Sequence, residues 1–448
     1  MLKQSLVRQS LAGIMLFMLA ALASAQNAAQ DQVYKIGTVQ ASGRPTYTIA
    51  VPSFKAMGGT VTGGSDIHNI IYNDLDLSGF FQRVKDQGFV EETAARDQAS
   101  GRVLFEEWSR LGAQYLVMGQ YQAGAGSALT GEYRLISIAD GKQITGKRYD
   151  FQQMNPRALA HRIADDIVQY LTAKRGIAGT KIVYVSRRGS SKEVYMIDPD
   201  GQNEHPVTRD NNLDATPCWG TNATEIYYTS FKDYNPDLCG VRVSSPDTSW
   251  WISRRQGFNL SPDFSPANKL IAVALGKDGN QEVYTMDRMG KNARRLTFNI
   301  GIDGSPSWSP EGNQIAFSSD RAHHGHPDVY VMEADGSNQR RLTTRNYYSD
   351  LPDWSPNGDK IVFSSQESKG DSFHIYTMGV DGSNWQQLTS GGSNNEDPSW
   401  APDGEHIVFS SNRSGNYQLY IMNSNGDNLH QLTRSGENHS PDWSPYLP

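Results

Sequence analysis

Six small, oxygen-bearing side chains recur five residues before a large aromatic residue in the second half of the chain. The aromatics are Trp219, Phe264, Trp308, Trp354, Trp400 and Trp443, and the preceding residues are Asp214, Asn259, Asp303, Ser349, Asn395 and Asn438. Such oxygens bind hard cations, and Ca²⁺ takes roughly six to eight of them. If each residue lies in the loop before its own aromatic strand, the six side chains would form a ring around one channel entrance. With Asp350 and Glu396 nearby, this entrance would be electronegative and could bind a partner protein or Ca²⁺. The alternative is turn chemistry, because Asp, Asn and Ser hydrogen-bond their own backbone in loops.

Two further groups could do chemistry. His323, His324 and His326 could bind a transition metal, but no carboxylate or thiol lies at a customary ligand spacing, so we interpret them as a solvated loop. Cys218 and Cys239 are the only cysteines. Their predicted strands lie two strand spacings apart, about 9.5 Å, whereas a disulfide needs Cα atoms within about 6.8 Å. We therefore expect two free thiols.

The spacing of the aromatic residues identifies the elements that must position these groups. Successive aromatics are 45, 44, 46, 46 and 43 residues apart. The clearest repeats have an aromatic before a Ser-Pro-x-Gly turn, a strand-like run such as Lys360-Ile-Val-Phe, a second run such as Tyr376-Thr-Met, and a turn such as Asp381-Gly382. Weaker copies have Phe264 before Ser-Pro and Trp219 before Gly-Thr. A period of this length that carries four short strands is typical of one blade of a β-propeller.

The number of blades follows from the second strand of each unit. These strands start at Lys181, Glu225, Leu270, Gln314, Lys360 and His406, which predicts six blades. The first of them has no Trp-Ser-Pro strand before it, and the motif at Trp443 has no strand after it. We therefore expect the C-terminal strand to complete the first blade, which closes the ring and leaves no long exposed edge.

The N-terminal part of the chain has a different organisation. Residues 1–25 fit a signal peptide, with an apolar run from Leu11 to Leu22 and the small residues Ala23-Ser24-Ala25 before the cleavage point. We expect a mobile tail at residues 26–42, a small α/β domain at 33–172, a linker at 173–180 and the propeller at 181–448. No other apolar run approaches the length of a membrane span. The net charge of −7 argues against nucleic acid as the partner.

The α/β domain is expected to alternate strands and helices. Strands are predicted at residues 47–51 and 114–119, and a hairpin turning at Asp140-Gly141 is predicted within residues 132–151. Helices are predicted from the spacing of Ile67, Ile70, Ile71 and Leu75, from that of Leu159, Ile163, Ile167 and Leu171 after Pro156, and at residues 103–111. Residues 58–64 are glycine-rich but lack the Lys-Ser/Thr that follows a phosphate loop.

The complete layout resembles the TolB family, the periplasmic propeller proteins of the Tol–Pal system in Gram-negative bacteria. The resemblance runs from about Val33 to the C-terminus. It rests on Ser42-Gly43-Arg44-Pro45 followed by Ile49-Ala50-Val51-Pro52-Ser53-Phe54, on Asp74-Leu75 with Ser78-Gly79-Phe80, on the Trp-Ser-Pro-x-Gly repeats, and on Trp443-Ser444-Pro445-Tyr446-Leu447. One departure is that residues 26–32 precede the family-like Val33, so the mature tail is longer than usual.

The resemblance implies a monomeric, non-enzymatic scaffold in the periplasm. Such proteins bind the outer-membrane lipoprotein Pal through the propeller and the inner-membrane protein TolA through the mature N-terminal segment, which corresponds here to Val33, Tyr34, Lys35 and Ile36. The system maintains outer-membrane integrity, draws that membrane inward during cell division, and is exploited by colicins. We expect the six mouth residues to lie at the centre of the Pal-binding face, which other outer-membrane lipoproteins could share, with Ca²⁺ as the one candidate cofactor.

Two other classes of function stay open at this point, a propeller enzyme and a cell-wall carbohydrate-binding module. The chain has no Gly-x-Ser-x-Gly motif, and its repeats leave no room for a separate hydrolase domain. An enzyme acting in the channel needs a converging set such as paired carboxylates, whereas the mouth positions vary from blade to blade without an obvious pair. A pull-down from a periplasmic extract distinguishes the classes, because only the scaffold retains Pal.

Overall fold

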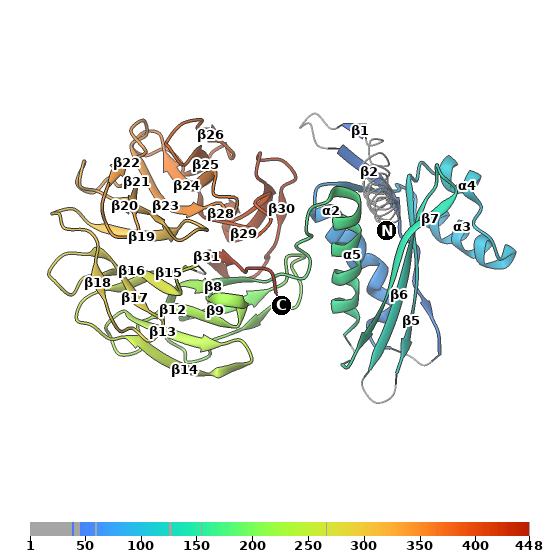
Figure 1. Ribbon diagram of the computed structural model, residues 1–448, viewed down its shortest axis with the longest axis horizontal. Helices are drawn as coiled ribbons and strands as arrows, with labels where there is room; N and C mark the ends of the chain where they lie inside the picture. The colour runs from blue at the N-terminus through green and yellow to red at the C-terminus, as the bar shows by residue number, and fades with distance from the viewer. Residues whose placement is uncertain are drawn as a thin grey trace, which may run out of the picture.

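A computed structural model describes residues 38–39, 45–58, 61–124, 128–153, 155–265 and 267–447. Two bodies follow each other along the chain, a mixed α/β domain and a β-propeller (Figure 1). The predicted signal peptide and Val33, Tyr34, Lys35 and Ile36 lie outside the described residues. Thr38–Val39 form strand β1, which pairs with β2 (Pro45–Ala50). These two residues, which lie where the predicted tail (26–42) and the predicted α/β domain (33–172) overlap, therefore belong to the sheet.

A seven-stranded sheet forms the centre of the N-terminal domain. Its strands follow the order β1-β2-β5-β6-β7, with β3 attached to β5 and β4 attached to β2. The further bounds are β3 (Lys55–Ala56), β4 (Phe81–Arg83), β5 (Tyr115–Ala123), β6 (Leu129–Ser137) and β7 (Lys142–Phe151). Strand β2 runs parallel to β5, and β5, β6 and β7 form an antiparallel meander that turns at Asp140-Gly141, as predicted.

Helices cover both faces of this sheet (Figure 1). The short helix η1 (Gly64–Asp66) leads into α2 (Ile67–Leu77), which packs with α5 (Pro156–Thr172) on the face toward the propeller, whereas α3 (Gln87–Ser100) and α4 (Phe105–Arg110) lie on the other face. Helix α5 begins where the sequence predicts, because Pro156 fits the first turn and Asn155 Oδ1 accepts a 2.9 Å hydrogen bond from the Ala158 amide. Helix α3 was not predicted, because its few buried residues form no apolar stripe.

The propeller has six four-stranded blades, as predicted (Figure 1). From the inside outward, blade 1 is β31-β8-β9-β10, and blades 2 to 6 are β11–β14, β15–β18, β19–β22, β23–β26 and β27–β30. The innermost strands are β11 (Asp214–Trp219), β15 (Asn259–Phe264), β19 (Asp303–Trp308), β23 (Tyr348–Trp354), β27 (Asn395–Trp400) and β31 (Glu437–Trp443). The second strands are β8 (Ile182–Arg188), β12 (Glu225–Ser230), β16 (Leu270–Leu275), β20 (Gln314–Ser319), β24 (Lys360–Gln366) and β28 (His406–Ser414).

The outer half of each blade is less uniform. The third strands are β9 (Ser191–Ile197), β13 (Asp237–Arg242), β17 (Glu282–Asp287), β21 (Asp328–Glu333), β25 (His374–Gly379) and β29 (Asn416–Asn423). The fourth strands are β10 (His205–Pro206), β14 (Ser245–Ser253), β18 (Arg294–Arg295), β22 (Arg340–Arg341), β26 (Gln386–Gln387) and β30 (His430–Gln431). Five fourth strands have 2 residues, whereas β14 has 9. The short helix η2 (Thr221–Ala223) lies between β11 and β12.

Packing between blades explains why the second strands are apolar on both faces. Ile361, Val362 and Phe363 of β24 are all fully buried, since their side chains alternate between the two neighbouring blades. Trp354, at the end of β23, packs into one apolar cluster with Val331 of the preceding blade and Phe363 of its own blade. The repeated aromatic residues are thus wedges between blades.

The C-terminal strand closes the ring. Strand β31 pairs antiparallel with β8, so the end of the chain forms the innermost strand of blade 1. Trp443 is buried, and its Nε1 donates a 2.8 Å hydrogen bond to Thr180 Oγ1. Trp219 of blade 2 in turn donates from its backbone amide to Asp442 Oδ2 at 2.6 Å. The predicted closure is therefore present on both sides of β31.

A buried group of charges joins the two domains. Arg157 Nη2 on α5 lies 2.6 Å from Asp200 Oδ2 and 3.2 Å from Asp198 Oδ2, both in the turn after β9 of blade 1. His161 Nδ1 on α5 lies 2.7 Å from Asp74 Oδ2 on α2. Burial opposes a charge on His161, but Asp74 and Asp198 outweigh it and raise its pKa to about 10. A protonated His161 therefore balances part of the negative charge at the junction.

Two smaller expectations can also be compared with the structure. Cys218 and Cys239 are free and buried, as predicted. Among the helices in the described part of the chain, none has the length and apolar composition needed to cross a membrane.

Candidate partner-binding face of the propeller

The six mouth residues share one position in the fold. Asp214, Asn259, Asp303 and Asn395 are the first residues of their innermost strands, and Ser349 and Asn438 are the second residues of theirs. The prediction that they lie in the preceding loops was therefore wrong by one or two residues. All six side chains are buried, with exposed fractions of 0 to 1%. They form a ring beneath the surface at one end of the blades rather than a solvent-facing rim.

Hydrogen bonds to nearby loops satisfy polar atoms of most of these buried side chains. Asn259 Nδ2 donates to the carbonyl oxygens of Pro236, Arg255 and Gly257 at 2.8–3.0 Å. Asp303 Oδ2 accepts from Asn299 Nδ2 at 2.7 Å and from Arg321 Nη2 at 2.8 Å. These side chains fix the loops that lead into the innermost strands, which is the role that turn chemistry predicts.

The same arrangement holds at three other ring positions. Asn395 Nδ2 donates to the Ser393 carbonyl oxygen at 2.8 Å, and its Oδ1 accepts from Arg413 Nη2 at 2.5 Å. Asn438 Nδ2 donates to Thr433 Oγ1 and to the Ser435 carbonyl oxygen at 2.9 and 3.0 Å. The Ser349 hydroxyl lies 2.9 Å from the Ser365 hydroxyl. The ring positions thus support the loops of this face from below.

Asp214 differs from the other five because it lies among other acids. Carboxylate oxygens of Glu193, Asp210 and Asp214 all lie within 4.8 Å of one another, which is close enough to hold one cation. Burial and the charges of Asp210 and Glu193 raise the pKa of Asp214 to about 7, although the hydroxyls of Thr208 and Ser230 favour its charged form. Three hard oxygen donors fit a cation such as Ca²⁺. A cation at the mouth would therefore be bound by these three carboxylates, on one side of the ring.

A channel runs along the propeller axis between the innermost strands. It contains a cavity of about 120 Å³, lined by three consecutive positions from every blade, such as Leu351-Pro352-Asp353 and Ser440-Pro441-Asp442. The first residue of each triplet has a left-handed backbone, with φ between 45° and 56°, and precedes a proline at a β-bulge. These residues are Thr216, Ser261, Ser305, Leu351, Asp397 and Ser440.

The third position of the triplets ties each blade to the next and was missed by the sequence analysis. Asp263 Oδ2 accepts from the Trp308 amide at 2.6 Å, and Asp353 Oδ2 accepts from the Trp400 amide at 2.7 Å. Between them, Ser307 Oγ accepts from the Trp354 amide at 3.0 Å. Asp and a smaller residue alternate at this position in the sequence Cys218, Asp263, Ser307, Asp353, Ser399 and Asp442. That alternation was the available signal.

These channel aspartates have unusual acidity. Burial raises the pKa of Asp263 to about 7 and that of Asp353 to about 6, although both accept hydrogen bonds from backbone amides that favour their charged forms. Burial also raises the pKa of Asp442 well above its ordinary value, and the charges of Asp353 and Asp263 add to the effect. Some of these channel carboxyl groups are therefore protonated near neutral pH.

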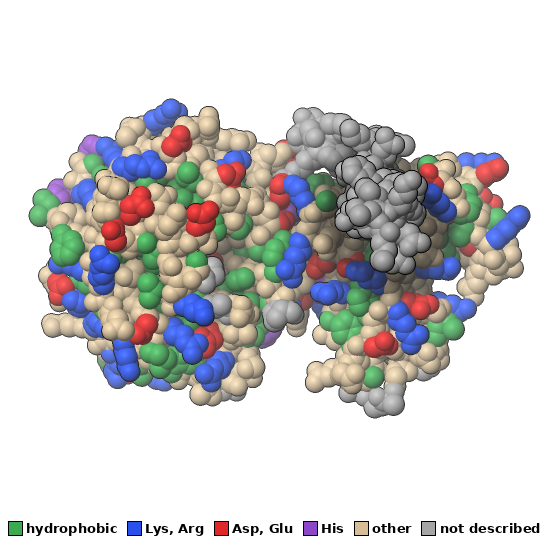
Figure 2. Space-filling view, in the orientation of Figure 1, with side chains coloured by type: hydrophobic (Ala, Val, Ile, Leu, Met, Phe, Trp, Pro, Cys, Tyr) green, Lys and Arg blue, Asp and Glu red, His purple; other side chains and the backbone are tan. Residues whose placement is uncertain are grey.

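Large apolar side chains project from the loops around the buried ring. Tyr234 is 99% exposed, Ile300 is 83% exposed and Phe298 is 72% exposed. Leu213, Phe258 and Ile302 are also exposed, and each immediately precedes a ring residue. In Figure 2, hydrophobic and histidine side chains protrude from the edge of the propeller that points away from the N-terminal domain. Clustered exposed apolar side chains of this kind mark protein-binding surfaces.

The histidine-rich segment belongs to the same end of the propeller. Residues 323–326 lie in the loop between β20 and β21, as predicted. His326 Nε2 lies 2.9 Å from Tyr347 Oη, and the two rings pack with centroids 4.1 Å apart. His323 Nδ1 lies 3.7 Å from Asp328 Oδ2. The loop adds polar and aromatic groups to the surface around the mouth.

Comparisons with known proteins agree on both domains. Residues 168–447 match the family model described as the TolB beta propeller domain, and residues 38–144 match the TolB amino-terminal domain. The chain is 32% identical over 284 residues to the Protein TolB homolog of Chlorobium chlorochromatii (strain CaD3), which covers 63% of each chain. It is 30% identical over 256 residues to the Tol-Pal system protein TolB of Desulfosudis oleivorans, which covers 56% of this chain and 58% of that one. The matched stretch therefore spans less than two thirds of either relative.

A solved structure supports the same fold. TolB from Acinetobacter baumannii superposes with a TM-score of 0.76 over 92% of this chain and 99% of that chain, at 23% sequence identity. This likeness concerns the arrangement of the two domains as well as the propeller.

Proposed function

The chain belongs to the TolB family, and we propose that it acts as a non-enzymatic scaffold of a Tol–Pal system in the periplasm. Relatives that share about a third of the aligned residues are named as Tol-Pal system proteins. On this proposal the propeller binds Pal, the N-terminal segment binds TolA, and the protein contributes to outer-membrane integrity and to inward movement of that membrane at division.

The observation that carries the Pal proposal is the exposed apolar surface around the buried ring. Phe298, Ile300 and Tyr234 offer large, exposed side chains in the loops at the end of the blades where the ring residues lie. Burying such side chains in an interface contributes most of the binding energy in typical complexes. The buried ring residues, Asp303 among them, act indirectly by holding these loops in place.

Deleting the exposed apolar contacts tests this proposal. A Phe298→Ser, Ile300→Ser double variant is expected to weaken Pal binding at least about tenfold, as loss of central apolar contacts usually does. Phe89→Ser is the matched control, because Phe89 is also exposed but lies on α3 of the N-terminal domain. Titration calorimetry with purified Pal gives both affinities. Unchanged binding by the double variant rejects this face as the Pal site.

The proposed TolA site lies in the N-terminal segment, where Val33, Tyr34 and Ile36 could pair by strand addition with an edge strand of the partner. Removing residues 26–36 spares β1 and β2, so the sheet of the N-terminal domain stays complete. This deletion is expected to abolish TolA binding and to retain Pal binding. TolA binding that survives the deletion contradicts the proposal.

The proposal also has to be distinguished from a propeller enzyme and from a cell-wall carbohydrate-binding module. A pull-down from a periplasmic extract with the full-length protein is expected to retain Pal and TolA. Retention of neither partner, in an extract that contains both, would reject the scaffold.

A further inference from the structure

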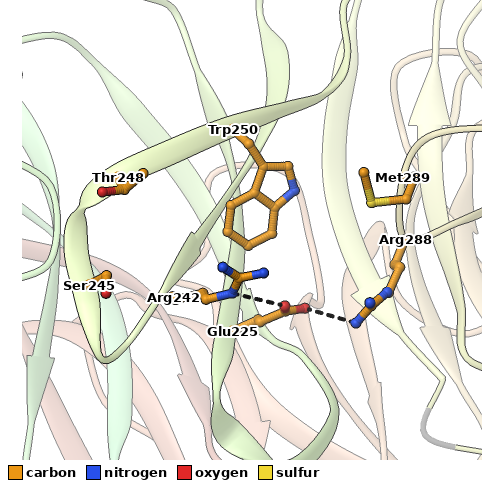
Figure 3. A pocket seen from close by; sticks show the side chains of 7 residues that line it. All are labelled: Glu225, Arg242, Ser245, Thr248, Trp250, Arg288 and Met289. Carbon is orange, nitrogen blue, oxygen red and sulfur yellow. Dashed lines mark ion pairs between the residues drawn. The ribbon is translucent and has the colours of Figure 1, made fainter.

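Blade 2 departs from the repeat at its outer edge. The other blades end in a two-residue fourth strand, but β14 extends over 9 residues and forms a long hairpin with β13. The sequence of this hairpin lacks the Asp-Gly turn and the Leu-Thr ending of the later repeats. The extra length brings Ser245, Thr248 and Trp250 over the gap between blade 2 and blade 3. A pocket of about 350 Å³ results (Figure 3).

An indole ring forms one wall of this pocket. Trp250 on β14 pairs with Gly240 on β13, and a Cβ at position 240 would lie 2.5 Å from Trp250 Cε2. Only glycine at this position allows the indole to lie against the sheet. The Arg242 guanidinium carbon lies 5.6 Å from the centre of the indole ring. Figure 3 shows the indole extending toward Arg242 and the Glu225 carboxylate.

Two guanidinium groups and one carboxylate form the floor. Arg242 Nε lies 3.8 Å from Glu225 Oε1, and Arg288 Nη1 lies 3.9 Å from Glu225 Oε2 (Figure 3). Both distances exceed hydrogen-bond length. The only hydrogen bond that Glu225 accepts from a described side chain comes from Tyr227 Oη at 2.8 Å.

The two arginines therefore keep their donors available. Their side chains are 65% and 61% exposed, and neither donates a hydrogen bond to any residue that the structure describes. Glu225, which is only 14% exposed, sits between them as an acceptor. A ligand that binds here has to offer an anion to the arginines, hydroxyl donors to Glu225, and a flat apolar face to the indole.

We propose that this pocket binds an acidic sugar, meaning a pyranose that carries a carboxylate. The carboxylate can pair with the exposed guanidinium of Arg242 or of Arg288, because guanidinium groups bind carboxylates in a two-pronged geometry. Ring hydroxyls can donate to Glu225 and exchange hydrogen bonds with Ser245 and Thr248, while the C–H face of the sugar packs on Trp250. A dianionic phosphate fits less well, since Glu225 would repel it from the centre of the site.

The pocket is separate from the proposed Pal face. Its residues lie at the end of the blades where β12 begins and β13 and β17 end. The register that pairs Asp214 with Ser230, and Glu225 with Arg242, places the ring residue and the pocket at opposite ends of blade 2. Sugar binding and Pal binding can therefore be measured independently, and the failure of one leaves the other standing.

Intrinsic tryptophan fluorescence and titration calorimetry on the full chain test the proposal. Glucuronate and N-acetylmuramate are the probes, and glucose and acetate supply the ring and the carboxylate separately. We expect saturable binding of an acidic sugar at about millimolar or lower concentration, with glucose and acetate each binding at least about tenfold more weakly. Arg288→Gln, a change at an exposed side chain, and Trp250→Ala should each weaken binding about tenfold or more.

Matched variants separate the site from general surface effects. Trp251→Ala is the control for Trp250, because it lies on the same strand and its ring packs instead with Arg254, whose guanidinium carbon is 4.7 Å from the ring centre. The control should bind the sugar as the unaltered protein does. Absence of saturable binding, acetate binding as tightly as the acidic sugars, or equal losses in the Trp251 and Trp250 variants would each overturn the proposal.

Discussion

At the scale of single residues, the channel aspartates combine a structural task with an adjustable charge. Asp263, Asp353 and Asp442 each accept the backbone amide of the aromatic residue in the next blade, at 2.6–2.7 Å. They are partly buried along the channel, and this burial raises the pKa of each. Ionisation of one raises the cost of ionising the others. The contacts that these channel aspartates make between neighbouring blades therefore depend on pH.

An Asp353→Asn variant is expected to reduce the pH dependence of stability. The pKa of Asp353 is raised from 3.8 to about 6. Because the folded protein binds this proton more tightly than the unfolded chain does, protonated Asp353 stabilises the fold fully below about pH 4. This stabilisation of about 3 kcal/mol is lost as the pH rises through 6. Asparagine keeps an acceptor for the Trp400 amide and does not titrate. Urea unfolding of both proteins between about pH 4 and pH 8 measures the difference.

The control for this change is Asp335→Asn, at an exposed turn carboxylate. It should leave the pH profile of the unaltered protein in place. An Asp353→Asn protein that loses as much stability between the two pH limits as the unaltered protein contradicts the assignment.

Residue spacing predicted that the six ring residues share one position in the repeat, but it placed them in loops and could not predict their burial. A fixed distance from an aromatic residue locates Asp303 in its strand. It does not reveal that Arg321, from the loop after the next strand, folds back onto Asp303 and covers it. Asp353 escaped notice for a related reason, since only the register between blades places it against the Trp400 amide. Contacts between blades are not encoded in the period of a single repeat.

Removing the ring carboxylate at Asp303 should destabilise the propeller as well as any interface. Asp303→Ala leaves the partly buried Arg321 without its carboxylate partner. Loss of a hydrogen bond between charged groups costs roughly 1.5–3 kcal/mol. The parallel change Asp335→Ala, in an exposed turn, should cost less than about 0.5 kcal/mol. Thermal unfolding of the two variants would refute the expectation if both lost equal stability.

At the scale of elements, the β-bulge of the innermost strands is the most regular feature and also a strained one. A left-handed residue before a proline recurs in all six innermost strands, and five of the six carry a polar side chain there. Leu351 is the exception, with φ of 56°. The sequence predicted these strands but not the bulge, because the proline that follows each left-handed residue was given no structural role. The long strand β14 was not predicted either, because its sequence does not match the repeat from which the other strands were predicted.

Leu351→Asn is expected to stabilise the protein. Asparagine tolerates the left-handed region better than leucine, for which that conformation costs about 1 kcal/mol or more. The gain should be about 0.5–1 kcal/mol after the loss of partial leucine burial. Leu260→Asn is the control, because Leu260 lies in the innermost strand of blade 3 outside the left-handed region. A lower unfolding midpoint for Leu351→Asn than for Leu260→Asn would contradict the strain argument.

At the scale of the whole molecule, two closures define the shape. Strand β31 joins the end of the chain to its first blade, and Arg157 and His161 join α5 to the turn after β9. The first closure could be predicted, because the first repeat lacks one strand and the last repeat has one to spare. The second could not, since Asp74, His161 and Asp198 are separated in sequence and share no pattern.

Removing residues 438–448 tests the first closure. The deletion exposes the edge of β8 and removes the buried Trp443. Loss of a buried tryptophan alone costs about 3–5 kcal/mol, a large part of a typical stability of 5–15 kcal/mol. A chain ending at Tyr446 keeps Trp443 and serves as the control. An unchanged, cooperative thermal transition in the longer deletion would reject the closure as a stabilising contact.

The position of β31 at the end of the propeller sequence also determines when the propeller can complete its folding during translation. The N-terminal domain holds its own core and can fold while the ribosome still adds residues. The propeller cannot, because blade 1 lacks its innermost strand until β31 has been made. The Lys181 amide donates to Ser444 Oγ, which lies directly after β31 and 263 residues later in the chain. A product released early keeps the apolar face of β8 uncovered, and open apolar edges of this kind are what proteases and chaperones recognise. Blade 1 is therefore complete only in a chain that includes β31.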